Sequence, residues 1–306
     1  MGTCKDLEKP YLRLTTYPKA ENVRPLAVLK ESLSHIKSRF VQTEDFEWAN
    51  EQLKSVRQDI TVQRIRNKFV LEVYETHARI LLERGDLDEF HQCQAMIRNL
   101  TSGASIQDAD INTEARDIGI HEDEFFDDND DEGKGSAVLR QTDEADDEFR
   151  AYGLLYALVQ SNWGELSRAL SDSKEYVGNG DSSSEAGDGK ELRRGSSFRH
   201  AIRVIKAILH DDYQAFFRLY ESAPHLSAYL MDFLVRRVRS TAYERIIAAY
   251  RPFLSVEHFR EALLLQDLEE TRRFLRRSGA VFLQEQGGPP FWVDCKATAY
   301  AAKKRK

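Results

Sequence analysis

Apolar residues recur at steps of three and four along much of the chain, which is the spacing of one face of an α-helix. The clearest stripe predicts a helix over 62–82, ended by Gly85, and a second helix over 86–100. Because the turn between them is very short, the two predicted helices form a hairpin. The apolar positions are Val62, Ile65, Phe69 and Val73 in the first helix, and Phe90, Cys93, Ile97 and Leu100 in the second.

Further helix pairs are predicted along the chain. They lie over 149–160 with 164–170, over 198–209 with 213–220, and over 226–239 with 241–251. Successive antiparallel pairs stack into a right-handed solenoid resembling tetratricopeptide repeats, although no strict period of about 34 residues is visible. The predicted fold is therefore mostly α, with a helical-repeat domain over 1–252.

The pattern changes after Pro252. A strong turn signal, Gly287-Gly288-Pro289-Pro290, separates two strand-like runs that follow two short helices. The order helix, helix and β-hairpin is that of a winged helix-turn-helix, so we predict a winged helix over 253–296 and a basic tail over 297–306. The predicted elements are helices over 255–265 and 267–277 and strands over 280–284 and 291–294.

Proline placement agrees with a helical fold. The chain has seven prolines, and none lies between Leu26 and Ala223. Because proline removes a backbone donor and clashes inside a helix, a long proline-free stretch favours helices.

The net charge of −7 is the sum over segments whose own net charges differ in sign. Residues 106–148 carry 17 acidic and 3 basic side chains, whereas residues 190–306 carry 22 basic and 13 acidic ones. An acidic run of this kind repels itself and has little to bury, so we predict a disordered acidic insertion at 106–148. Residues 177–195 are rich in Gly and Ser and are predicted to form a flexible loop. The C-terminal part of the chain is therefore basic.

Arginines concentrate in the last predicted helices. Four of them occupy the second helix of the predicted winged module, the position of a recognition helix, and at i,i+4 spacing they form two adjacent stripes. Such cations bind phosphates without reading sequence, so the expected ligand is RNA or DNA. The alternative is that they complement the helix dipole and pair with Glu269, Glu270 and the acidic insertion. The candidate nucleic-acid-binding residues are Arg236, Arg237, Arg239, Arg272, Arg273, Arg276 and Arg277.

Other basic positions are less specific. Arg199, Arg203 and Lys206 form a stripe that we interpret as a solvated face. Ser196 follows Arg193-Arg194-Gly195 and is a candidate phosphorylation site. The chain ends on a run that is either a nuclear localisation signal or a solvated basic end, formed by Lys303, Lys304, Arg305 and Lys306.

No pattern typical of an active site or a metal site is present in the sequence. Asp59, Glu72 and Glu75 fall on amphipathic helices, where carboxylates are usually salt-bridged surface groups. The eight histidines show no metal-ligand pairing. We therefore expect no enzymatic activity, no metal and no cofactor.

Two further expectations concern the compartment. No run of about 18 apolar residues exists, so we expect no membrane span. The three cysteines are too few and too scattered for a disulfide scaffold or a zinc site. We therefore expect a reducing compartment, the nucleus or the cytosol.

Several sequence blocks are specific enough to indicate a family. They are YLRLT (11–15), VRPLAVLK (23–30), QLKSVRQDITVQ (52–63), VYETHARI (73–80), GDLDEFHQCQ (85–94), FRAY (149–152), and FFRLY (216–220) followed by Ala223-Pro224. Together they resemble the GANP (germinal-centre-associated nuclear protein) and suppressor-of-actin family, and within it the branch of leukocyte receptor cluster member eight. The resemblance covers about residues 10–295.

The resemblance implies a PCI-type fold, the module shared by the proteasome lid, the signalosome and an initiation factor. It also implies a non-enzymatic nuclear scaffold in transcription-coupled mRNA processing or export. The implied partners are a second PCI-type protein, docked through the winged helices, and a small acidic peptide of the proteasome-lid type. Two alternatives stay open: a PCI subunit of a lid, signalosome or initiation-factor assembly, and a peptide-binding helical-repeat adaptor without nucleic acid.

Overall fold

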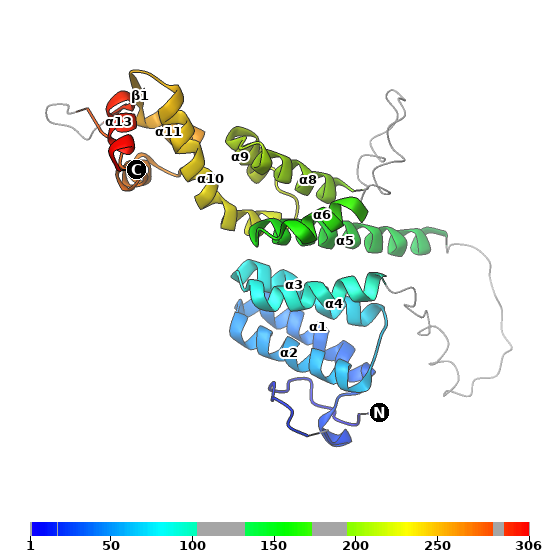
Figure 1. The fold of residues 1–306 in the computed structure, drawn as a ribbon. Helices are drawn as coiled ribbons and strands as arrows, with labels where there is room; N and C mark the ends of the chain where they lie inside the picture. Colours follow the sequence, from blue (N-terminus) through cyan, green and yellow to red (C-terminus); the bar gives the residue numbers. More distant parts are fainter. Residues whose placement is uncertain (1, 17, 103–131, 173–194, 284–290, 306) are drawn as a thin grey trace. The chain divides into compact units, whose positions relative to one another are not determined.

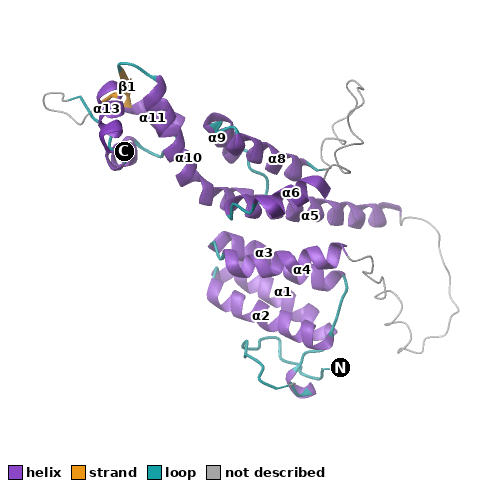
Figure 2. Cartoon of the chain, in the orientation of Figure 1, coloured by secondary structure: helices purple, strands orange, loops and turns teal. Residues whose placement is uncertain are grey.

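A computed structural model of the chain describes residues 2–16, 18–102, 132–172, 195–283 and 291–305. Over these ranges the protein is mostly helical, as the apolar pattern predicts, with short strands near the C-terminal end (Figures 1 and 2). The chain divides into two compact units, Met1–Phe149 and Arg150–Lys306.

The first unit is built from consecutive helices, in which α1 packs against α2, α2 against α3, and α3 against α4. Gly85 ends α3 with a left-handed backbone (φ 79°), and the Asp86 side chain accepts a hydrogen bond from the backbone of Glu89 at the start of α4. The predicted hairpin turn at this point is therefore confirmed. The helices are the 3-10 helix η1 (Ala20–Asn22), α1 (Leu26–Thr43), α2 (Phe46–Gln63), α3 (Lys68–Arg84), α4 (Leu87–Ser102) and the first part of α5 (Glu132–Val159).

The predicted start of the helix over 62–82 is wrong. Arg64 ends α2 with a left-handed backbone (φ 56°). The Asn67 side chain then caps α3 by accepting a hydrogen bond, 3.1 Å long, from the backbone N–H three residues later. Val62 therefore lies on α2 and α3 begins at Lys68, so the apolar spacing across this point is coincidental.

Part of the predicted disordered acidic insertion at 106–148 is helical instead. α5 begins at Glu132, and near the end of the acidic stretch Glu148 is buried and paired with Arg79 of α3 at 2.8 Å. Pairing with a cation offsets the repulsion on which the prediction of disorder rested. The remainder of the insertion, and the predicted Gly/Ser loop as far as residue 194, lie outside the described residues.

The second unit begins within α5 and ends with a small mixed module. In it α8 packs against α9, α9 against α10, and α11 against α12. Its further elements are α6 (Trp163–Asp172), α8 (Ser196–Leu209), α9 (Tyr213–Glu221), α10 (Ser227–Ala249), β1 (Phe253–Ser255), α11 (Val256–Ala262), α12 (Leu268–Arg277), β2 (Trp292–Asp294) and α13 (Cys295–Arg305).

α10 is one continuous helix where two helices were predicted, over 226–239 and 241–251. At the predicted break, the side-chain hydroxyls of two polar residues donate hydrogen bonds to backbone carbonyls of the same helix. Ser240 donates to the carbonyl of Arg236, and Thr241 donates to that of Arg237. Such bonds to the carbonyl four residues back let Ser and Thr stand inside a helix. The prediction of a break is therefore wrong.

The strands form a two-stranded antiparallel sheet in which β1 pairs with β2. Phe282, inside the run predicted as a strand over 280–284, bridges Val293 of β2 in antiparallel fashion. The two predicted strand runs therefore pair with each other, while the turn between them lies outside the described residues. β1 was not predicted, and the predicted basic tail at 297–306 is helical through residue 305, as part of α13.

Candidate nucleic-acid interface

α12 carries four of the seven arginines predicted to bind nucleic acid. The helix is capped by Asp267, whose side chain accepts a hydrogen bond from the backbone of Glu270 at 2.6 Å. Acidic residues occupy its first turn and arginines its last, which suits the helix dipole at both ends. Arg273, Arg276 and Arg277 are exposed to solvent.

The fourth arginine of α12, Arg272, is buried, with only 9% of its surface exposed. Its guanidinium lies 3.7 Å from the carboxylate of Glu269, one turn earlier on the same helix. Arg272 and Arg276 therefore do not form a solvent-exposed stripe, because Arg272 is buried and only Arg276 is exposed. For Arg272 the structure agrees with the alternative of pairing within the helix.

Arg239 is also engaged inside the protein. Its guanidinium donates hydrogen bonds to the backbone carbonyls of Leu263, at 2.9 Å, and Leu264, at 2.5 Å. These carbonyls lie where α11 ends, so Arg239 ties α10 to the turn between α11 and α12. Its role is structural, and the accessible candidates are Arg236, Arg237, Arg273, Arg276 and Arg277.

Arg236 and Arg237 share an exposed face of α10 with two aromatic residues. Tyr229 and Phe233 are 39% and 48% exposed, and Phe233 lies four residues after Tyr229, with Arg236 and Arg237 three and four residues after Phe233. Within the described part of the chain, neither arginine forms a salt bridge. The sequence pattern could have indicated the aromatic residues, because both lie off the buried stripe of Leu230, Leu234 and Val238.

A hollow of about 360 Å³ adjoins this face and is called here the α8–α10 hollow. Its wall is mainly apolar and comes from α8, α9 and α10, and Arg237 is one of its lining residues. Trp163, at the start of α6, also lines it and is 47% exposed. The exposed face of α10 therefore leads directly into the hollow.

A second aromatic surface lies on the small sheet. Phe253 of β1 and Trp292 of β2 are 45% and 40% exposed, whereas their neighbours in the paired register, Leu254 and Val293, are more covered. Phe291 stands edge-on to Trp292, with ring centroids 5.6 Å apart. Exposed aromatic side chains that lie together form a candidate contact site for another macromolecule.

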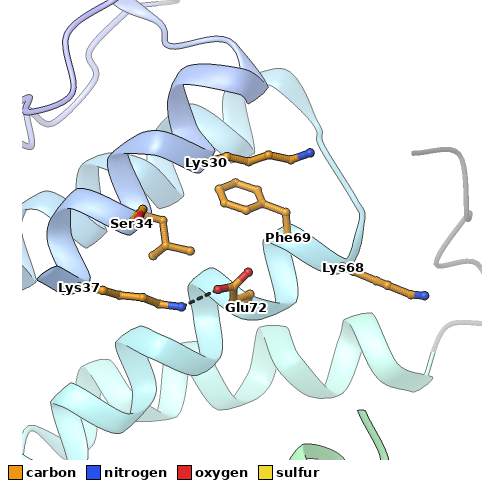
Figure 3. A pocket seen from close by; sticks show the side chains of 7 residues that line it. Lys30, Ser34, Lys37, Lys68, Phe69 and Glu72 are labelled. Carbon is orange, nitrogen blue, oxygen red and sulfur yellow. Dashed lines mark hydrogen bonds and ion pairs between the residues drawn. The ribbon is translucent and has the colours of Figure 1, made fainter. Parts of the chain in front are cut away.

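Figure 3 shows a lysine-rich hollow in the first unit, between α1 and α3. Its volume is about 510 Å³, and Lys30, Lys37 and Lys68 stand around a floor that includes Phe69. Lys37 forms an ion pair with Glu72 at 2.5 Å, which neutralises one of its cations. The sequence pattern did not indicate this hollow, because its residues are far apart along the chain.

The carboxylates considered as catalytic candidates are all paired with cations. Asp59 accepts from Arg24 and from Lys9, at 2.7 and 2.6 Å, and Glu72 pairs with Lys37. Glu75 lies 3.7 Å from Arg79, and burial raises the pKa of its carboxyl to about 7. Asp59 is fully buried, so the expectation of a surface group is wrong for it, although the expectation of pairing is confirmed.

The only buried histidine and cysteine that lie side by side also belong to the protein core, within the described residues. Arg57 donates to Glu89 at 2.8 Å and contacts His77 Nδ1 and Cys93 Sγ at 3.1 and 3.3 Å. Burial lowers the pKa of His77 well below its usual value and raises the pKa of the Cys93 thiol to about 11. A neutral thiol beside a neutral imidazole suits packing rather than nucleophilic attack.

The weaker sequence candidates lie on exposed surface where the structure describes them. Arg199, Arg203 and Lys206 are exposed on α8, as expected of a solvated face. Ser196 is exposed at the first position of α8. Lys303 is exposed on α13, Lys304 and Arg305 lie in the same helix, and Lys306 lies outside the described residues.

Two kinds of feature are absent from the described residues. None of their helices is long and apolar enough to cross a membrane. Nor do they contain a group of three or more His, Cys, Asp or Glu side chains placed to hold a metal ion.

Comparison with known proteins gives a consistent result. The SAC3/GANP family model matches residues 9–284. The chain is 34% identical over 296 residues to the Leukocyte receptor cluster member 8 homolog of Xenopus laevis, covering 97% of this chain and 30% of that protein. It is also 34% identical over 282 residues to a THP3 homolog of Schizosaccharomyces pombe, covering 92% and 58%. SAC3 family protein A of Arabidopsis thaliana is 31% identical over 311 residues, covering 97% and 25%.

Proposed function

The chain belongs to the SAC3/GANP family, and from this membership we propose that it is a non-enzymatic nuclear scaffold in mRNA processing or export. The relatives named THP3 and SAC3 support this proposal. The chain spans between a quarter and three fifths of the length of these relatives, so the role proposed here is that of the shared region.

The proposed architecture is a tetratricopeptide-like solenoid that ends in a winged helix, as in PCI-type proteins. Helix pairs such as α3 with α4 and α8 with α9 support the solenoid. The order β1, α11, α12, a bridging run at Phe282, and β2 supports the winged helix. In this arrangement α12 is the counterpart of a recognition helix.

The proposed ligand of the basic surface is RNA. The observation that carries this proposal is the set of five exposed arginines on α10 and α12, of which Arg236 and Arg237 stand beside exposed aromatic rings. Cations of this kind bind phosphates by displacing counterions, and aromatic rings bind bases. The phosphates of DNA would bind the same arginines, so the affinity for DNA is the comparison for the affinity for RNA.

The proposed protein partner is a second PCI-type protein, bound on the aromatic surface of Phe253, Phe291 and Trp292. A small acidic peptide of the proteasome-lid type remains the further partner that the family resemblance implies. Affinity purification of the tagged chain from nuclei tests these proposals, since RNA-processing proteins should dominate the bound fraction. Dominance of lid-type or signalosome subunits, or of unrelated peptide clients, would favour one of the two alternative functions instead.

A salt titration of RNA binding tests the nucleic-acid contact. Changing Arg273, Arg276 and Arg277 to Glu should weaken binding strongly and flatten the dependence of affinity on salt. The matched control is Arg199→Glu with Arg203→Glu, which changes exposed arginines of α8 in the same unit. Equal affinity of the α12 variant and the wild type would remove α12 from the proposed interface.

A further inference from the structure

The exposed face of α10 combines aromatic rings with arginine side chains. Tyr229 and Phe233 lie one helical turn apart, and Arg236 and Arg237 follow within the next turn. All four side chains are exposed, while the opposite side of the helix is buried through Leu230, Leu234 and Val238. The packing of the unit therefore does not require these aromatic rings to face solvent.

The adjoining α8–α10 hollow extends the same surface. Its volume of about 360 Å³ suits a single planar ring system, and its wall includes Ile208, Leu209 and Val238. Trp163 offers a third exposed aromatic ring at the hollow, and Arg237 belongs both to the hollow and to the α10 face. Exposed rings, and arginines without an ion pair among the described residues, thus follow one another from Tyr229 to Trp163.

The charges around the hollow leave Arg237 available. Asp211 is paired with Arg245 at 2.5 Å. The Asp212 side chain caps α9 by accepting a hydrogen bond from the backbone of Ala215 at 2.9 Å. Within the described residues, neither of these carboxylates forms an ion pair with the Arg237 guanidinium.

We propose that the α10 face and the α8–α10 hollow form a track for single-stranded RNA, with bases stacked on Tyr229 and Phe233 and one base held beside Trp163. Arg236 and Arg237 contact the phosphates between these bases. Stacking requires unpaired bases, because the faces of bases in a duplex are already covered by their neighbours. The proposal rests on the proposed RNA contact and adds to it the strandedness of the RNA and the residues that bind its bases.

Fluorescence anisotropy with a labelled oligouridine of about 12 nucleotides tests the track in the full chain. Tyr229→Ala and Phe233→Ala should each weaken binding by roughly 5- to 150-fold, the range of one base stack, without changing the dependence on salt. Arg236→Gln with Arg237→Gln should lower the salt slope by about 1.4, since each phosphate contact on a single strand contributes about 0.7. A duplex RNA of the same length should bind equally well to the wild type and to the aromatic variants.

Phe253→Ala is the matched aromatic control, because Phe253 is 45% exposed in the same unit but lies off the track. Quenching of tryptophan fluorescence by RNA gives a second readout, and it should be reduced in Trp163→Phe. Wild-type affinity in the Tyr229 and Phe233 variants, with the arginine variants still weakened, would overturn the track and leave the RNA contact standing. The absence of any salt-dependent RNA binding by the wild type would overturn both.

Discussion

The guanidinium of Arg24 and the carboxylate of Asp59 form an ion pair that is closed to solvent, with Nε and Oδ2 2.7 Å apart. Arg24 also donates to the hydroxyl of Ser55 at 2.9 Å and to the carbonyl of Leu7 at 3.1 Å. Lys9 approaches the second carboxylate oxygen of Asp59 at 2.6 Å. A single carboxylate of α2 therefore holds two separate parts of the chain that precede α1.

Removing the charge of Asp59 should destabilise the first unit. Asp59→Asn leaves the buried Arg24 guanidinium without its counterion, and breaking a buried pair in this way costs about 3–5 kcal/mol. Urea denaturation measures the loss, and hydrogen exchange of the α2 amides assigns it to this unit. Glu72→Gln, which breaks the exposed pair with Lys37, is the control and should cost at most about 1 kcal/mol. Equal effects of the two substitutions would contradict the prediction.

Removing the guanidinium of Arg239 should loosen the module that follows α10. Arg239→Gln deletes two charge-assisted hydrogen bonds to the carbonyls of Leu263 and Leu264, and we expect a loss of about 1–3 kcal/mol. Faster amide exchange in α11 and α12 is the expected signature. Arg236→Gln, on the exposed face of the same helix, should change stability by no more than about 0.5 kcal/mol. Unchanged exchange in the Arg239 variant would show that the two bonds do not hold the module.

The stability of the first unit should contain a pH-dependent contribution from Glu75. Burial raises the pKa of its carboxyl from 4.5 to about 7, so the folded state binds a proton more tightly than the unfolded state does. The contribution is fully present below about pH 4.5 and is lost as the pH rises through 7. A shift of this size corresponds to about 3 kcal/mol.

Glu75→Gln isolates this contribution from that of other groups. The variant should match the wild type near pH 4.5 and exceed its stability by about 1–3 kcal/mol at pH 8, because the amide never ionises. The difference between the two urea denaturation curves, measured over this pH range, gives the effect directly. A difference that does not change with pH would contradict the assigned pKa.

The three cysteines should differ in their reaction with a thiol reagent. Cys93 and Cys295 are fully buried, and burial raises the pKa of both thiols, to about 11 for Cys93. Cys4 is partly exposed. Brief treatment with a maleimide at pH 7 should therefore modify Cys4 alone, and mass spectrometry of the peptides should find the other two adducts only after denaturation.

The apolar periodicity predicted most helices but not their ends. The apolar spacing continues through Ile65, which lies in the loop and belongs to neither helix, whereas α3 begins at the cap formed by Asn67. The reverse error occurred in α10, where Ser240 and Thr241 suggested a break that their bonds to the helix carbonyls remove. Helix caps and hydrogen bonds from Ser or Thr hydroxyls to helix carbonyls depend on single side-chain contacts. The spacing of apolar residues carries no information about these contacts.

The sequence predicts that the candidate site is basic, but it does not predict which arginines are exposed or that aromatic residues lie beside them. The sequence predicts seven arginines at the site, but Arg272 is buried and Arg239 is bound to two backbone carbonyls. Whether an arginine faces solvent depends on which helix packs against it, and this is a property of the folded unit. Tyr229 and Phe233 were missed because aromatic residues on a helix are usually assigned to the core.

The contacts of the N-terminal segment also set an order of events during synthesis. The backbone of Gly2 donates to Gln63 and that of Lys9 to Gln52, as Arg24 does to Asp59, so these partners on α2 are made 35 to 61 residues later. Residues 2–24 therefore leave the ribosome well before the helix that receives them. The contacts of this segment with α2 can therefore form only after α2 has emerged, whereas the hydrogen bonds within the segment, such as that from Thr3 to Ala20, need no later residue.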